Sequence, residues 1–477
     1  MGDETAAGRG ETDGETRARR VDRRTLIRVG GMAATVGTVG RVARPSTGRA
    51  VAQATPSGEP VTVTDNGLPP ENQPEQVEVY EQIVERYESA NPNVTVESTA
   101  NAWDPQTFPA RLAAGELEDA FNVPYTEPQG IIARGQAADI TEYLQAWPSF
   151  PSYNPNALQV VSDAEGRIYG IPIFGYALGL MYNRTFFEEA GLDPDSPPAT
   201  WDDLRSAAKA LTGDGRAGFA ETSTDNQGGW HFTAWTYSAG GTLEEVDAEG
   251  GATAVFNSEE GVAALQLLKG MRFEDEAMTD RQLLNQDDTR EMMATGQIAM
   301  CVQAPDSLPW IADRYPDVDM EQFGFGILPQ NGGNATLAGG SVWMFNPNSE
   351  PEVIQAAVDW ILFKEFDLEN LDARLAADQE RGALIGAPES PIFTGEYLEQ
   401  RQEVFARYAN APTENYRAFI EGSATLELRG EPPVETQQLY AAIDPAVQAV
   451  LTDEGADPQE LLDEAAEQFQ SQVLDRL

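Results

Sequence analysis

The alternation of apolar and polar positions predicts a strand, a helix and a second strand at the start of the folded chain. Pro60 to Asp65 alternates Val with Thr, as expected for a strand. Gln76 to Ala90 carries apolar side chains at helical spacing, which predicts an amphipathic helix. Val94 to Ser98 is expected to form the second strand. A strand–helix–strand unit with short connections predicts a parallel α/β sheet.

The middle of the chain contains two extended segments followed by helices. Residues 168–173 alternate apolar residues with Gly and Pro, and Pro172 excludes a fully paired central strand there because it lacks an N–H. Ala177 to Tyr182 is a nearly continuous apolar run, typical of a strand buried on both faces. Asn183 is expected to start a short helix, and Thr200 is expected to cap the next one.

The later part of the chain is predicted to be mostly helical, with two further strands. Ser258 is expected to cap a helix, because its side chain can accept from the backbone of the first turn. The predicted elements are a helix over Glu259–Met271, a helix and strand within 289–300, a strand over 323–329, and helices over 352–366, 434–451 and 458–477.

Several spaced elements resemble one family. They are Tyr-Gly-Ile-Pro at 169–172, Leu-Met-Tyr-Asn at 180–183, Phe-Phe-Glu-Glu-Ala-Gly-Leu at 186–192, and a Pro-x-Thr-Trp-Asp-x-Leu element at 198–204. In this order they resemble the extracellular solute-binding proteins of ABC importers, in the group of sugar and oligosaccharide binders typified by maltose-binding proteins. The resemblance covers about residues 59–477.

This resemblance implies an α/β fold of the two-lobed type II periplasmic-binding-protein class. Each lobe would be a mainly parallel sheet flanked by helices, and the chain would cross between the lobes three times. The expected crossings lie near 173–177, 324–327 and 378–386. The expected bounds are 59–174 plus 327–378 for lobe one, and 177–325 plus 385–477 for lobe two.

The charge of the chain is strongly negative, with 78 acidic against 31 basic residues. Such a surface repels nucleic acid and anionic membranes, so neither is expected as a partner. The Debye length falls to about 3 Å at 1 M salt, where this self-repulsion is screened. The composition therefore resembles that of proteins from extreme halophiles, a haloarchaeal type; the alternative is an acidic protein without that adaptation.

The first 54 residues read as an export signal. Arg23 and Arg24 precede a weakly apolar run from Val29 to Val42, and two Ala-x-Ala sites follow within 50–54. This arrangement predicts a twin-arginine signal, with a basic tail as the alternative. The protein is expected outside the cell, on the surface side of the membrane. No Cys follows the leader, so a lipid-modified cysteine is not expected there.

Catalytic and metal chemistry is not predicted. Cys301 is the single cysteine and His231 the single histidine, which excludes an intrachain disulfide and a multi-His metal site. A Ser-His-Asp site would need His231, and no Gly-x-Ser-x-Gly partner is present. The chain shows neither a P-loop nor a dinucleotide fingerprint, and no cofactor is expected. A secreted glycoside hydrolase remains the remote alternative.

Aromatic and polar residues near the expected cleft are the candidate solute contacts. Aromatic rings stack on the apolar faces of sugars, and polar groups bond their hydroxyls. By resemblance, Trp230 lies where sugar-binding relatives carry a stacking ring. Trp343 follows the close turn at Gly339-Gly340. The other contacts implied on the cleft side are Tyr125, Glu127, Asp65, Asn66 and Tyr176; for each, the alternative is a core or solvated loop residue.

One segment departs from the family pattern. After the strand that ends near Met300, relatives often carry Gly-x-Trp, whereas this chain has Gln303-Ala-Pro-Asp306 and then Trp310. This departure speaks against a disaccharide-type pocket. Gln303 and Asp306 are expected to bond hydroxyls or a cationic solute instead.

The resemblance predicts a non-enzymatic, monomeric solute-binding component. It would capture a mono- or oligosaccharide between the lobes and deliver it to the ABC permease subunits in the membrane. The alternatives with the same fold are a polyol, glycerol phosphate or a polyamine.

Overall fold

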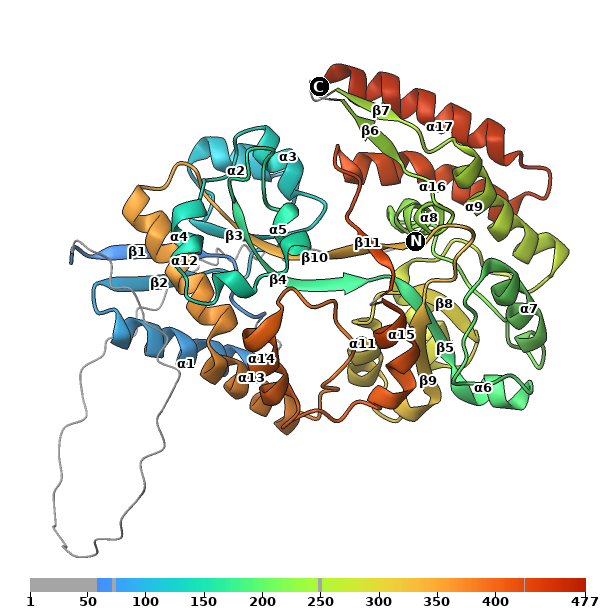
Figure 1. The fold of residues 1–477 in the computed structure, drawn as a ribbon, viewed down its shortest axis with the longest axis horizontal. Helices are drawn as coiled ribbons and strands as arrows, with labels where there is room; N and C mark the ends of the chain where they lie inside the picture. The colour runs from blue at the N-terminus through green and yellow to red at the C-terminus, as the bar shows by residue number, and fades with distance from the viewer. Residues whose placement is uncertain (1–57, 71–73, 248–250, 424) are drawn as a thin grey trace, which may run out of the picture. The chain divides into compact units, whose positions relative to one another are not determined.

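The computed structural model describes residues 58–70, 74–247, 251–423 and 425–477 (Figure 1). The predicted export signal over 1–54 lies outside these residues and stays a prediction. Two main sheets and a two-stranded ribbon are formed within this part of the chain.

The first sheet is mixed rather than mainly parallel. Its order is β11-β10-β3-β1-β2, and β4 also pairs with β10. The β1 strand runs parallel to β2 and β3, as the opening pattern predicted, but β10 runs antiparallel to β3 and β4. The strands are β1 (Val61–Asp65), β2 (Val94–Ser98), β3 (Ala120–Pro124), β4 (Gly170–Ala177), β10 (Ala335–Phe345) and β11 (Glu427–Arg429).

The second sheet is antiparallel, so the expectation of a mainly parallel sheet is wrong here. The central strand β5 (Gly179–Asn183) pairs antiparallel with β8 (Met300–Gln303) and with β9 (Phe323–Ile327). The chain leaves the first sheet along β4 and enters the second at β5, whereas it returns through β9 toward β10. Strands that carry the chain in opposite directions between two sheets must pair antiparallel. All five residues of β5 are buried, as its apolar run predicted.

Helices cover both sheets, and their starts follow local sequence. The side chains of Thr200 and Ser258 accept from backbone N–H groups of the first turn, which confirms both predicted caps, and Asn183, predicted to start a helix, caps α6 in the same way. The helices are α1 (Pro74–Ala90), α2 (Phe108–Ala114), α3 (Pro128–Ala133), α4 (Thr141–Gln145), α5 (Pro155–Gln159), α6 (Arg184–Glu189), α7 (Trp201–Leu211), α8 (Gln227–Ser238), α9 (Glu259–Lys269), α10 (Gln286–Ala294), α11 (Ser307–Arg314), α12 (Pro351–Phe366), α13 (Leu368–Glu380), α14 (Gly395–Phe405), α15 (Arg417–Ser423), α16 (Thr436–Thr452) and α17 (Pro458–Gln472).

Pro172 lies where the pairing of β4 is irregular. The register of β4 against β10 shifts between Ser341 and Val342, opposite Phe174 and Pro172. Among the described strands, β4 pairs with β10 alone. A residue without an N–H is tolerated at such an edge, as the sequence predicted.

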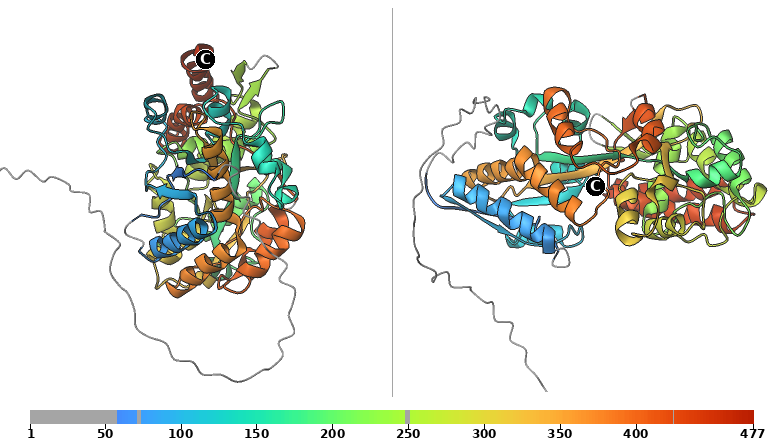
Figure 2. Two further views of the ribbon diagram at one scale, coloured as in Figure 1. Left: turned by 90° about the vertical axis from the view of Figure 1, so that its left-hand side faces the viewer. Right: turned by 90° about the horizontal axis from the view of Figure 1, so that it is seen from below.

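Two large apolar cores underlie the sheets. The first core packs β1, β3, β10, α1 and α12, and Figure 2 shows α1 and α12 beside one another. The second core packs β5, α7, α8, α9, α16 and α17. Phe393 and Tyr397 belong to the first core, where their rings pack around Trp147 and Phe366, although residues from 385 onward were expected in lobe two. The predicted lobe bounds otherwise stay a prediction.

We expect Glu244 to make the stability of the protein depend on pH. It lies in the short strand β6 (Glu244–Val246), which pairs with β7 (Ala252–Ala254). It is buried, and burial raises the pKa of Glu244 to about 7. The folded state therefore holds a proton that the unfolded carboxyl loses near pH 4.5. The stabilisation is complete below that pH and is lost as the pH rises through 7. We expect Glu244→Gln to remove about 2–3 kcal/mol of this pH dependence, measured by urea unfolding at pH 5 and pH 8.

An exposed acid provides the control for this measurement. Glu464→Gln in α17 changes a solvated carboxyl and should leave the slope of stability against pH unchanged. An unchanged slope in Glu244→Gln as well would contradict the assignment.

Candidate functional site

A pocket of about 230 Å³ lies between residues that follow β3 in the first sheet and residues of α8 and α16 in the second core. Tyr176, on β4, also lines it. We call it the aromatic pocket, and its lining is Pro124, Tyr125, Thr126, Tyr176, Asp225, Asn226, Gln227, Trp230, Glu431, Gln437 and Tyr440. Three of the predicted contact residues, Tyr125, Tyr176 and Trp230, therefore meet in one place.

Two of the aromatic rings in this pocket touch without stacking face to face. The Tyr176 and Trp230 rings meet edge to face, with centroids 6.1 Å apart and an angle of 85° between their planes. Both side chains are half-buried, so each keeps some surface open. The Tyr125 hydroxyl is buried and has no hydrogen-bond partner among the described residues. Burial also raises the pKa of Tyr125, so that its hydroxyl remains a donor at neutral pH.

A carboxylic acid, Glu431, stands beside these rings. It accepts a hydrogen bond from the Tyr440 hydroxyl. Burial raises the pKa of Glu431 to about 7, against the lowering effect of hydrogen bonds from Tyr440 and Trp230. Near neutral pH this group is therefore divided between an acceptor and a donor form.

The N-terminus of α8 reaches the pocket, but its amides are already occupied. The Asp444 carboxylate accepts from the N–H groups of Asn226 and Gly229, each at 2.8 Å. The Asn226 side-chain amide donates to Gln437 Oε1 at 3.0 Å and so ties α8 to α16. A carboxylate of the protein thus fills the position that an anionic ligand would take at a helix N-terminus.

A buried polar network supports Trp230 from behind. Its neighbour His231 lies with Nδ1 2.5 Å from Glu221 Oε1, and both side chains are 1% exposed. The indole of Trp235 donates to the other oxygen of Glu221 at 2.8 Å. The single histidine therefore ties α8 to Glu221.

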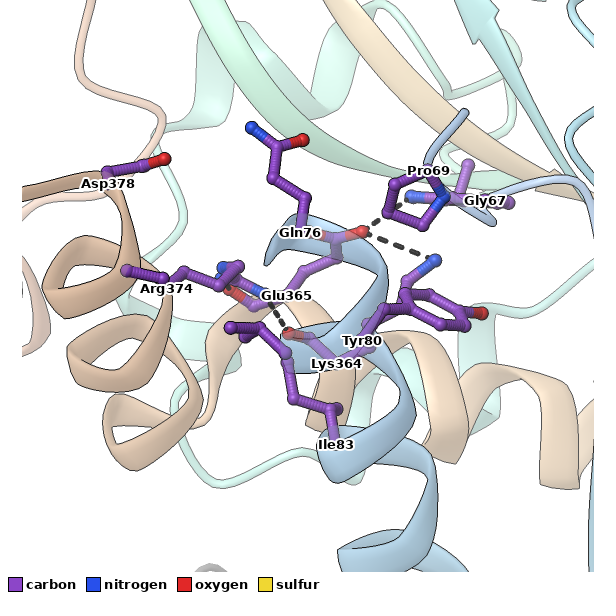
Figure 3. A pocket seen from close by; sticks show the side chains of 12 residues that line it. Gly67, Pro69, Gln76, Tyr80, Ile83, Lys364, Glu365, Arg374 and Asp378 are labelled. Atoms are coloured by element: carbon purple, nitrogen blue, oxygen red, sulfur yellow. Dashed lines mark hydrogen bonds and ion pairs between the residues drawn. The ribbon is translucent and has the colours of Figure 1, made fainter. Parts of the chain in front are cut away.

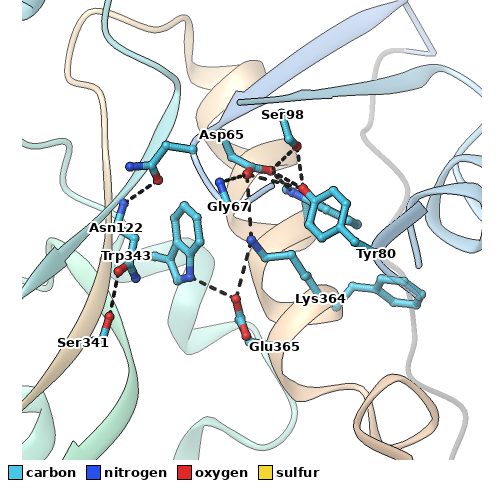
Figure 4. Close-up of polar contacts among 12 residues, drawn as sticks. Asp65, Gly67, Tyr80, Ser98, Asn122, Ser341, Trp343, Lys364 and Glu365 are labelled. Atoms are coloured by element: carbon cyan, nitrogen blue, oxygen red, sulfur yellow. Dashed lines mark hydrogen bonds and ion pairs between the residues drawn. The ribbon is translucent and has the colours of Figure 1, made fainter. Parts of the chain in front are cut away.

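Two of the predicted contacts lie elsewhere. Asp65 has no exposed surface, and its carboxylate accepts from the Gly67 N–H at 2.6 Å and from Trp360 Nε1 at 2.6 Å (Figure 4). Trp343 is buried, and its indole donates to Glu365 Oε1 at 3.1 Å. These placements speak against contact of either residue with a solute in the aromatic pocket, because their polar atoms are used by the protein.

Trp343 instead lines a second pocket, of about 250 Å³, between α1, α12 and α13 (Figure 3). Lys364 Nζ lies 3.8 Å from the centre of the Trp343 ring. It forms ion pairs with Asp65 at 3.9 Å and with Glu365 at 3.5 Å. Lys364 is thus paired within the protein, and Arg374 of the same lining donates to the backbone carbonyls of Lys364 and Glu365.

The remaining predicted contacts are also engaged outside the lining of the aromatic pocket. Asn66 Oδ1 accepts from the Asn122 N–H at 2.9 Å. Gln303 is fully buried and donates to Thr289 Oγ1 at 2.8 Å. Asp306 pairs with Arg290 at 2.8 Å. Glu127 lies at the N-cap of α3, next to Thr126 of the pocket, and burial raises its pKa.

Sequence reasoning missed Glu431, Tyr440 and Asp444, which come from the end of the chain. No motif marks them, because the packing of α16 against α8 brings Tyr440 to the pocket and Asp444 to the start of α8. Glu431 lines the pocket through its bond with Tyr440. Glu221 carries no local signal either, because it stands between Phe219-Ala220 and the polar residues Thr222 and Ser223.

Gly340 controls the position of Tyr125. A Cβ at this residue would lie 2.1 Å from the Phe174 carbonyl oxygen and 2.7 Å from the Tyr125 ring. We expect Gly340→Ala to cost about 1–3 kcal/mol of stability and to weaken solute binding by displacing that ring. Thermal unfolding and ligand titration measure the two effects. Gly430→Ala, where the added Cβ meets nothing within 4 Å, should change neither; equal behaviour of the two variants would contradict this account.

The described residues form no group of His, Cys, Asp and Glu side chains that could hold a metal ion. Within the same residues, no helix combines the length and apolar character needed to cross a membrane.

The sequence is similar to those of known binding proteins. Residues 72–366 match the family model described as bacterial extracellular solute-binding protein. A binding protein of Brucella abortus is 24% identical over 301 residues, covering 60% of this chain and 69% of its own. The sn-glycerol-3-phosphate-binding periplasmic protein UgpB of Rhizobium meliloti is 24% identical over 297 residues, covering 58% and 65%.

Solved structures share the fold. The maltose-bound MalE3 of T. maritima has a TM-score of 0.65 at 22% identity, covering 87% of this chain and 100% of that one. UgpB of Mycobacterium tuberculosis, in complex with glycerophosphocholine, has a TM-score of 0.67 at 18% identity, covering 87% and 98%. These likenesses confirm the predicted two-lobed α/β fold of periplasmic-binding proteins. The chain belongs to the family of bacterial extracellular solute-binding proteins, and it is a solute-binding protein of the ABC-transporter type.

Proposed function

We propose that the solute is a sugar, a mono- or oligosaccharide, which binds in the aromatic pocket and is passed to a membrane permease. The observation that carries this proposal is the meeting of Tyr125, Tyr176 and Trp230 with hydrogen-bonding side chains in one pocket. Rings of this kind pack on the apolar faces of sugars, while amides and hydroxyls bond their oxygens. Structural relatives named as binders of maltose and of alpha-D-tagatose support it.

A glycerol phosphate ligand is the second candidate, favoured by the name of the R. meliloti relative. The chemistry of the pocket speaks against it. Among the described residues that line the pocket, none is Lys, Arg or His. The amides at the start of α8 face Asp444. A phosphate would therefore meet carboxylates where it needs basic groups.

Export by the twin-arginine route, a monomeric state and adaptation to high salt belong to the same proposal. The export route rests on the leader sequence and the salt adaptation on the excess of acidic residues. The monomeric state rests on the resemblance to the family. Tryptophan fluorescence of the mature protein in molar salt tests the solute, through titration with neutral sugars, amino sugars, polyols, polyamines and glycerol phosphate. Saturable binding of at least one sugar is expected; binding of glycerol phosphate alone would overturn the sugar assignment.

A further inference from the structure

We infer that the solute is an amino sugar or another hydroxylated amine, whose ammonium group lies against the Glu431 carboxylate in the aromatic pocket. This inference rests on the proposed function, because it assumes that the aromatic pocket is the solute site. It goes further by assigning a charge to the solute.

Glu431 has no cationic partner among the residues that the structure describes. Its carboxylate has the Tyr440 hydroxyl and the Trp230 indole as neighbours, both neutral donors. Arg429 is the nearest basic residue along the chain, and it is engaged elsewhere. It pairs with Glu427 at 3.2 Å and donates to the Gly241 carbonyl at 2.9 Å.

Without a cationic partner, ionisation of the Glu431 carboxyl is unfavourable. A carboxylate that is withdrawn from water without a counter-charge is unfavourable, so it either takes up a proton or meets a cation. Burial disfavours the ionised form of Glu431 and so raises its pKa. A bound ammonium group would supply the missing charge and restore ionisation.

Aromatic rings surround Glu431 in the pocket. The Trp230 and Tyr176 rings stand beside Glu431, and Tyr125 and Tyr440 complete the lining. Faces of Trp and Tyr rings attract cations, most strongly where water is excluded. Asp225 adds a second carboxylate to the same lining. Rings and acids without a basic residue form a site for a cation, and the polar side chains of the lining serve the hydroxyl groups of the solute.

Binding of an ammonium group is expected to release protons from Glu431. An ammonium group beside Glu431 lowers the pKa of that carboxyl, so binding at pH 7 releases up to about half a proton per site. The titratable groups that face Glu431 are Tyr440 on α16, Tyr237 on α8 and Tyr176 on β4. The pKa of each tyrosine is raised, so all three stay neutral at this pH.

Matched pairs of sugars test the inference. Calorimetric titration of the mature protein in molar salt would compare glucose with glucosamine, galactose with galactosamine, and cellobiose with the β-1,4-linked glucosamine disaccharide. At least one amino sugar is expected to bind about 10- to 100-fold more tightly than its neutral partner, the range of a charge-assisted hydrogen bond. Repeating the titration in buffers of different ionisation enthalpy should show the released proton.

Two variants locate the effect. Glu431→Gln should bring the ratio of the two affinities to about one and abolish proton release. Glu421 is an exposed acid on α15, and Glu421→Gln should retain both the preference for the amino sugar and the proton release. Equal affinity of the neutral and amino sugars, or a preference that survives Glu431→Gln, would overturn this inference and leave the proposed function standing. Absence of binding by every sugar in the set would overturn the proposed function, and the inference with it.

Discussion

Replacing Trp230 by alanine is expected to weaken solute binding about 30-fold or more. Trp230 is half-buried, lines the aromatic pocket and meets Tyr176 edge to face. Loss of its ring removes apolar contact with the solute, worth about 2 kcal/mol. An affinity change of about 30-fold corresponds to that energy. Calorimetric titration with the best-binding sugar measures it.

A second tryptophan provides the control. Trp310 is also half-buried but packs between Arg290 and Arg314, outside the lining of the pocket. Trp310→Ala should leave the affinity within about twofold of the unchanged protein, because a substitution without contact to the site is near neutral for binding. Equal losses in the two variants would show that the loss at Trp230 comes from general damage to the fold.

Replacing Asp65 by alanine is expected to lower the free energy of unfolding by about 3–5 kcal/mol, the cost of breaking a buried charged pair from one side. Its carboxylate accepts from Ser98 Oγ at 2.9 Å and from Trp360 Nε1 at 2.6 Å, and it is the ion-pair partner of Lys364. Without it, the buried Lys364 ammonium and the Trp360 N–H lose a partner. Chemical denaturation measures the loss.

The same substitution at an exposed ion pair is the matched control. Asp313 is 67% exposed and pairs with Arg381 at 3.2 Å, so Asp313→Ala should cost less than about 1 kcal/mol. The Asp65→Ala protein that remains folded should still bind the solute, because Asp65 has no exposed surface. Stability equal to that of Asp313→Ala would contradict the structural role assigned to Asp65.

Local sequence was sufficient for most of the elements. The caps at Thr200 and Ser258 depend on a side chain and the first turn that follows it, so a short window of residues decides them. The buried strand β5 follows from its own apolar run. The direction of pairing in the second sheet was not predictable in this way, because it depends on strands β8 and β9, far along the chain.

The site was predictable only in part. Trp230, Tyr125 and Tyr176 could be named because family elements mark their surroundings. Asp65 and Trp343 were expected at the cleft for the same reason. In the structure, both are buried and contact the Lys364 ammonium group. Glu431 and Tyr440 carry no local signal, and the packing of α16 on α8 brings Tyr440 to the pocket, where it bonds Glu431.

Hydrogen exchange with and without the bound sugar tests most directly whether the aromatic pocket is the solute site. We expect slowed exchange in three separate segments, 124–127, 225–231 and 431–440, because each contributes to the lining. Residues 374–378, which line the second pocket, should be unaffected. Protection confined to the second pocket, or absent from the three segments while the sugar is bound, would show that the solute binds outside the aromatic pocket.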